Sequence, residues 1–115
     1  MIKRKEDLEI TVRSQMKGGP GQVVQTTFST KEELLNKGRL FGNLHLDQNC
    51  GIGYHVHEKE TELFYVASGE ALYNDNGTEV VVKQGDICVC KPGEGHGVKT
   101  NNTTCDLIAV IILED

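Results

Sequence analysis

Short β-branched segments separated by turn residues are the feature that most restricts how this 115-residue chain can fold. From residue 39 onward the links between these segments are short and rich in Gly, Asn, Asp and Pro, which tolerate positive φ or form side-chain turns. Such links favour antiparallel pairing of neighbouring strands, since a parallel crossover needs about a dozen residues. The expected strands are 40–46, 52–57, 62–67, 70–73, 78–82, 87–90, 97–100 and 105–113.

An antiparallel set of about eight strands in so short a chain has to hide its sheet edges. Closure into a barrel, or into a double-sheet jelly roll, achieves this. The sequence therefore predicts an all-β barrel over residues 39–115. A chain of this length builds one hydrophobic core, so we expect a single domain.

Residues 1–38 precede the predicted barrel and carry fewer signals. Residues 23–28 are expected to form a strand. Thr30 and Glu33 have the spacing of a helix capping box, which predicts one or two helical turns over 32–36. We expect this N-terminal segment to provide contacts for a dimer.

Charge and hydropathy exclude two classes of partner. Twelve Lys and Arg residues against 17 Asp and Glu residues give a net charge of −5, which argues against nucleic-acid binding. The longest apolar run, 107–113, is far shorter than the roughly 20 residues of a membrane-spanning helix. The N-terminus lacks the apolar stretch of a secretory signal. We therefore expect a cytoplasmic protein that binds neither nucleic acid nor membrane.

The four cysteines support that compartment. They form no Cys-x-x-Cys pair. Cys88 and Cys90 are two positions apart in a predicted strand and should point to the same face. We interpret the cysteines as buried, reduced thiols that act as small apolar residues, the alternative being a disulfide or a thiolate ligand.

The most informative stretch contains His55, His57 and Glu62. Side chains alternate along a strand, so the two imidazoles should project to the same side. If residues 58–61 form a hairpin loop, His57 lies opposite Glu62, with Cβ atoms about 4.5–5.5 Å apart. A His-x-His pair alone often arises by chance. The carboxylate at this spacing strengthens the case for a metal site.

His96 follows a glycine-rich turn and could join the same end of the barrel from a neighbouring strand. Three of the four histidines of the chain would then meet one carboxylate, and burial of these groups without a cation would be costly. The set suits one divalent transition metal ion and does not select among Mn, Fe, Co, Ni and Zn.

These residues resemble the first motif of the cupin superfamily, which reads Gly, five residues, His-x-His, three or four residues, Glu, six residues and Gly. His55, His57, Glu62 and Gly69 match this spacing. Asn49 stands where the family has its first glycine, with a glycine two positions later.

The second cupin motif reads Gly, five residues, Pro-x-Gly, two residues, His, three residues and Asn. The interval from Gly85 to His96 is that of the family. Pro92 and Gly95 are displaced from their motif positions, and Thr100 occupies the position of the Asn. The ligand spacing is thus similar to the family's, while the turn residues differ.

The resemblance covers residues 39–113. It implies a double-stranded β-helix, or conical jelly-roll barrel, with the metal inside on His55, His57, Glu62 and His96. Similar cupins leave one or two coordination positions open to water, substrate or dioxygen, which permits Lewis-acid chemistry. They often dimerise by strand exchange or sheet packing, and we expect a homodimer here.

Fold alone does not determine the reaction. The leading hypothesis is a metal-dependent enzyme of oxygenase or decarboxylase type that acts on a small organic acid or enediol. The alternatives are a non-catalytic cupin that binds a small molecule and a cupin-type sugar isomerase or epimerase. The sequence does not identify a catalytic residue.

Five further polar residues lie near the site in sequence, and three of them have two interpretations each. Arg39 could clamp a substrate carboxylate or be a solvated charge. His45 could support the site or lie on the surface, depending on strand register. Glu94 could act as an acid or base at the barrel mouth or be a turn charge. Glu58 and Glu60 are interpreted as solvated loop residues.

Overall fold

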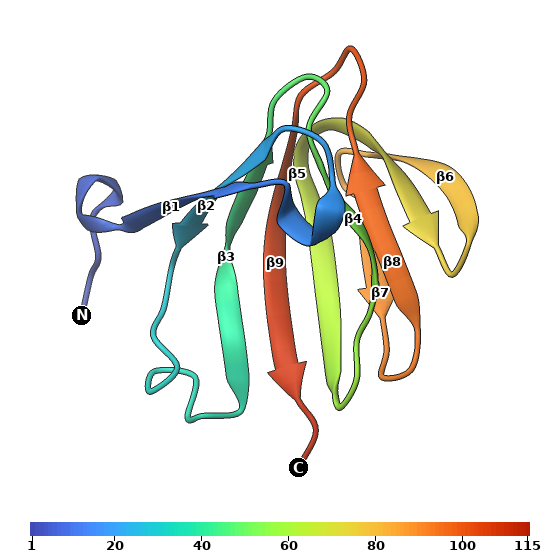
Figure 1. Ribbon diagram of the computed structural model, residues 1–115. Helices are drawn as coiled ribbons and strands as arrows, with labels where there is room; N and C mark the ends of the chain where they lie inside the picture. Colours follow the sequence, from blue (N-terminus) through green and yellow to red (C-terminus); the bar gives the residue numbers. More distant parts are fainter.

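The computed structural model describes all 115 residues as a curled β structure with two short 3-10 helices (Figure 1). The helices are η1 (Lys5–Asp7) and η2 (Met16–Gly18), and the strands are β1 (Glu9–Ser14), β2 (Gln22–Thr27), β3 (Gly38–Leu46), β4 (Gly51–Val56), β5 (Glu60–Asp75), β6 (Thr78–Lys83), β7 (Ile87–Cys90), β8 (Gly95–Lys99) and β9 (Cys105–Leu113).

The strands form two faces of a barrel that share β5. The large sheet has the order β1-β2-β3-β9-β5-β7, and the small sheet has the order β4-β8-β5-β6; every pairing is antiparallel. In Figure 1 the two sheets curve toward each other, with β9 and β5 between the β1–β2 hairpin and the β4–β8 pair. This is the predicted all-β jelly-roll barrel.

A bend in β5 lets this one strand belong to both sheets. Its first part pairs with β9 and β7, and residues 70–75 pair with β6 and β8. The register with β9 shifts between Val66 and Ser68. Gly69 follows with φ +73°, and a Cβ there would collide with the carbonyl oxygen of Thr104. The predicted strands 62–67 and 70–73 are therefore two halves of a single bent strand.

Neighbouring strands in the chain do not all pair with each other, which corrects the hairpin expectation. β3 pairs with β2 and β9, whereas β4 pairs with β8. Thus the chain crosses from one sheet to the other after β3 and again after β4. Short links allow this because each crosses the end of a narrow barrel and does not reverse within one sheet.

The core fills the space between the sheets with the inward-facing residues of each strand. Leu44 and Val66 flank Leu107 in register, and all three are almost fully buried. All four cysteines are buried and free. Burial raises the pKa of Cys88, Cys90 and Cys105 to about 11, so these thiols stay protonated near neutral pH.

The N-terminal segment departs from expectation in two ways. β1 was not predicted, because its residues are almost all exposed and lack an apolar face toward the core. The capping box forms: the Glu33 amide donates to Thr30 Oγ1 (3.1 Å) and the Thr30 amide donates to Glu33 Oε1 (2.9 Å). No helix follows, because Leu35 and Asn36 adopt positive φ and the chain turns instead.

The outer face of the large sheet carries a row of paired residues in which isoleucine and tyrosine side chains outnumber polar ones. The pairings place Ile10, Thr26, Asn43, Ile108, Tyr65 and Ile87 side by side across six strands. Ile10 is 64% exposed and Ile87 is 58% exposed.

The structure contains no helix whose length and hydrophobicity would let it span a lipid bilayer.

Candidate metal centre

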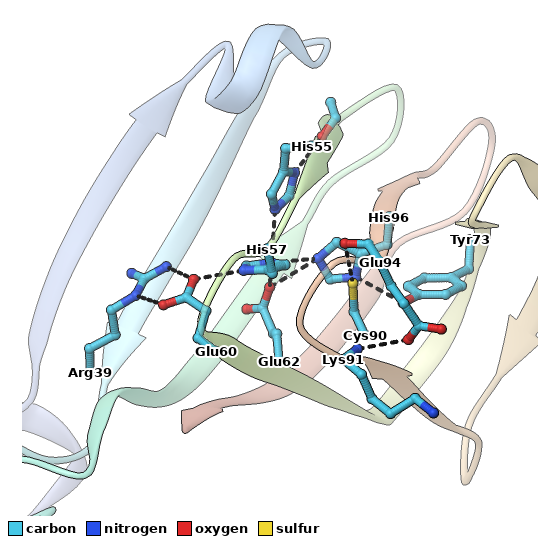
Figure 2. Close-up of polar contacts among 11 residues, drawn as sticks. Arg39, His55, His57, Glu60, Glu62, Tyr73, Cys90, Lys91, Glu94 and His96 are labelled. Carbon is cyan, nitrogen blue, oxygen red and sulfur yellow. Dashed lines mark hydrogen bonds and ion pairs between the residues drawn. The ribbon is translucent and has the colours of Figure 1, made fainter. Parts of the chain in front are cut away.

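His55, His57, Glu62 and His96 converge at one point inside the barrel (Figure 2). The Nε2 atom of His57 lies 3.1 Å from Nε2 of His55 and 3.0 Å from Nε2 of His96. Glu62 Oε1 lies 3.0 Å from Nε2 of His57 and 3.1 Å from Nε2 of His96. Four ligand-type atoms therefore surround a common centre and lie within 4.8 Å of one another.

The two sheets supply these residues from opposite sides. His55 of β4 is the direct cross-strand partner of His96 in β8, which belongs to the small sheet. Glu62 lies on β5 in the large sheet, where it pairs with Ile111 of β9. The expectation that His57 and Glu62 meet as a hairpin pair was wrong, because they approach each other across the barrel.

Backbone hydrogen bonds fix His57, which follows the end of β4. The His57 amide donates to the Glu94 carbonyl (3.0 Å), and its own carbonyl accepts from the Gly93 amide (2.7 Å). The turn before His96 thus holds the second histidine of the His-x-His pair. This explains why the glycine-rich turn and the pair lie together in space.

Hydrogen bonds at the outer nitrogens aim the imidazoles inward. His55 Nδ1 donates to the Gly53 carbonyl (2.7 Å), and His57 Nδ1 donates to Glu60 Oε1 (2.7 Å). His96 Nδ1 lies 2.8 Å from the Tyr73 hydroxyl. Since a carbonyl and a carboxylate only accept, His55 and His57 carry their protons outside and present Nε2 lone pairs to the centre.

The chemistry of the four groups fits a cation. Lone pairs and a carboxylate point at one another, an arrangement that a metal ion at the centre would satisfy. Burial raises the pKa of Glu62, but its close contacts with His57 and His96 outweigh burial, and the net effect is a lowered pKa. The carboxylate is therefore ionised, as a metal ligand must be.

Glu60 supports the centre, and its interpretation as a solvated loop residue was wrong. Its side chain is only 13% exposed and accepts two hydrogen bonds of 2.7 Å from Nε and Nη2 of Arg39. The Arg39 and His57 contacts lower the pKa of Glu60 to about 2. The position of Glu60 three residues after His57 was the sequence signal that could have indicated this contact. Glu58 is exposed, as expected.

Replacing Glu60 with alanine is expected to weaken metal binding about 10- to 100-fold, because His57 loses the acceptor that orients its ring. Isothermal titration of the metal-free protein with Mn²⁺ would measure this. Glu58→Ala removes the same charge from an exposed neighbour and should leave the affinity within about twofold. Equal losses in both variants would contradict an orienting role for Glu60.

A cavity of about 260 Å³ opens beside three of the four residues. Its wall combines His55, His57 and Glu62 with apolar side chains from both sheets, including Leu44 of β3 and Ile52 of β4. Three cationic residues also line it, Arg13, Lys17 and Arg39, together with Glu60, which pairs with Arg39. A small anion would therefore meet the positive charges of Arg13 and Lys17 on entering.

Two other candidates lie away from this cavity. His45 of β3 hydrogen-bonds Asp106 (2.9 Å) and Asp47 (3.1 Å) on the outer side of the barrel. Glu94 accepts a hydrogen bond from the Lys91 amide (2.8 Å) and stabilises the turn before β8. The surface and turn interpretations therefore hold for His45 and Glu94. Tyr73 was missed, although it lies at an inward position of β5.

Comparisons with known proteins agree with this architecture. The Cupin_2 family, described as a cupin domain, matches residues 43–112. The "Oxalate-binding protein" of Thermotoga maritima is 39% identical over 114 residues, which cover 98% of this chain and 94% of that protein.

Solved structures give the same result. A predicted oxalate decarboxylase from Thermotoga maritima superposes with a TM-score of 0.93 and 38% identity, covering 98% of this chain and 99% of that one. The polyketide cyclase RemF from Streptomyces resistomycificus, at 18% identity, shares the fold with a TM-score of 0.76 over 100% of this chain and 81% of its own. From its sequence and its barrel alike, the chain belongs to the cupin family.

Proposed function

We propose that this protein binds a small dicarboxylate, with oxalate as the first candidate, at a metal ion held in the barrel. The observation that carries the proposal is the cavity of about 260 Å³, which joins the His-Glu cluster to the cationic side chains of Arg13 and Lys17. A dicarboxylate would use both features: one carboxylate would bind the metal ion, and the other would pair with a cationic side chain.

The residues proposed as ligands are His55, His57, Glu62 and His96. Three imidazoles and one carboxylate suit Mn, Fe, Co, Ni or Zn, so the ion is left open. A bound ion would supply Lewis acidity and open positions for carboxylate oxygens. The Gly53 carbonyl would hold the imidazole ring of His55 in place, and Glu60 would hold that of His57.

The sequence match and the structure match, both from Thermotoga maritima, point to the same ligand. The first is named for oxalate binding and the second is described as a predicted oxalate decarboxylase. Both align with nearly the whole of this chain at 38–39% identity. We take oxalate from them as the ligand to test first.

The test is calorimetric titration of oxalate into protein loaded with Mn²⁺, with metal-free protein as the control. We expect saturable binding at one site per chain that requires the metal. Elemental analysis of untagged protein made without added metal would identify the native ion. Equal oxalate binding with and without metal, or no binding to the loaded form, would refute the proposal.

Decarboxylation of the bound acid is the second candidate, because one similar structure is described as a predicted oxalate decarboxylase. Loss of CO₂ leaves an electron pair on carbon that a proton must quench, and water entering the cavity would supply that proton. Formate production from oxalate by the loaded protein would favour the enzyme.

We further propose that the protein forms a homodimer through the outer face of the large sheet. Residues 1–38 would take part, since β1 contributes Ile10 and Val12 to that face. A stable dimer needs about 800 Å² from each partner, and the six-stranded face is the broad apolar surface that suits a second copy. Sedimentation of wild type as a monomer would refute the dimer, and Val12→Glu should dissociate it.

We also propose that residues 1–38 and the barrel at 39–115 form one domain, because β2 pairs with β3.

We also propose a cytoplasmic location. Four buried free thiols suit a reducing compartment. Fractionation of the source cells would test this, and recovery from an extracellular or periplasmic fraction would contradict it.

A further inference from the structure

The N-terminal hairpin forms one wall of the cavity at the metal centre. Arg13 of β1, Lys17 of η2 and Gln25 of β2 line the same space as His55 and His57. These three residues precede residues 43–112, which the cupin domain family matches. The metal cluster therefore belongs to the common barrel, while the facing wall comes from the segment before it.

Gln25 is a polar side chain that points into the barrel and is only 8% exposed. Its Nε2 donates to Thr27 Oγ1, and its Oε1 accepts from Nε of Arg13, both at 3.1 Å. Arg13 pairs with Val23 across the strands, so it is the diagonal neighbour of Gln25 on the inward face. Burial of a side-chain amide is costly unless the amide is hydrogen-bonded. The hydrogen bonds of the Gln25 amide satisfy it and also hold the Arg13 guanidinium in place.

Arg13 keeps most of its hydrogen-bonding capacity free. The contact with Gln25 uses Nε, whereas neither Nη atom of Arg13 donates a hydrogen bond within the chain. Arg39, the residue expected from sequence to clamp a carboxylate, differs in this respect. Its Nε and Nη2 both bind Glu60, so the fork of Arg39 is engaged within the protein.

We propose that Arg13, positioned by Gln25, receives the second carboxylate of the ligand and makes the site select dianions over monoanions. This inference rests on the proposed function, in which the first carboxylate binds at the metal. The planar guanidinium matches a carboxylate through two parallel hydrogen bonds. Arg13 is thus a specificity-determining residue, and Gln25 is a positioning residue that acts through it.

The experiment compares oxalate with glyoxylate, a two-carbon acid that lacks the second carboxylate. Both are titrated into Mn²⁺-loaded wild type, Arg13→Gln and Arg13→Lys, with metal content measured for each protein. Arg13→Gln should weaken oxalate binding about 10- to 100-fold and glyoxylate binding less than about threefold. Arg13→Lys keeps the charge but loses the planar guanidinium, so its oxalate affinity should lie between those of wild type and Arg13→Gln.

Arg4→Gln is the matched control, because it removes the same charge from an exposed residue outside the cavity. It should bind oxalate as wild type does. Gln25→Leu should reduce the preference for oxalate without changing metal content. Since Arg13 is itself exposed, its replacement does not threaten the fold.

The outcomes separate the two proposals. If loaded wild type fails to bind oxalate, the proposed function falls and the role of Arg13 falls with it. If wild type binds oxalate and Arg13→Gln binds it equally, only the role of Arg13 is refuted. Equal losses for Arg13→Gln and Arg4→Gln, equal losses for the two acids, or loss of the metal would also refute it.

Discussion

Replacing His57 with alanine is expected to lower the affinity for Mn²⁺ by more than about 100-fold, the largest effect of any single change at the site. The Nε2 atom of His57 is within 3.1 Å of ligand-type atoms on all three other residues. Its loss removes one of four ligands and leaves Glu62 without one of its two imidazole partners. Metal analysis after dialysis and calorimetric titration with Mn²⁺ would measure the effect.

His45→Ala is the matched control, because it deletes a histidine that lies outside the barrel. It should retain the metal content of wild type. Circular dichroism of the metal-free proteins would show whether both variants keep the fold. Full metal content in folded His57→Ala would exclude this residue as a ligand.

Replacing Leu107 with alanine is expected to destabilise the protein by about 2–5 kcal/mol. Leu107 is 0% exposed and lies on β9, the strand between β3 and β5 in the large sheet. Its side chain packs in the row formed with Leu44 and Val66, so truncation leaves a cavity where the sheet cannot collapse. Urea unfolding of the metal-free protein would measure the change.

Leu35→Ala makes the same substitution in a turn where the side chain is 74% exposed. It should change the free energy of unfolding by less than about 0.5 kcal/mol. Metal-free protein is required because a bound ion would add its own binding energy to the folded state. Similar losses in the two leucine variants would contradict the placement of Leu107 in the core.

The barrel could be predicted from the sequence because turn residues and alternating apolar positions are local signals. The predicted strand 105–113 matches β9, and 87–90 matches β7. Pairing between strands is not local, and it caused the main error. The choice between a hairpin and a crossing to the other sheet after β4 depends on the shape of the whole barrel, which no short stretch encodes.

The four clustered residues could be predicted from their types and spacing, although the geometry assumed for Glu62 was wrong. Their supporting residues could not be identified in this way. Arg13 and Gln25 meet the cavity only because β1 pairs with β2, and β1 has no buried pattern that predicts a strand. Glu60 was assigned to solvent because its partner Arg39 is 21 positions away in the sequence.

The sharing of β5 between the two sheets has a mechanical consequence. Glu60 and Glu62 lie near one end of this strand, and Tyr73 lies near the other. Because hydrogen bonds to four other strands hold β5, the halves of the barrel cannot hinge apart around the centre without breaking those pairings. The four clustered side chains are therefore held on a rigid frame, and a ligand that binds there would meet a preformed cavity.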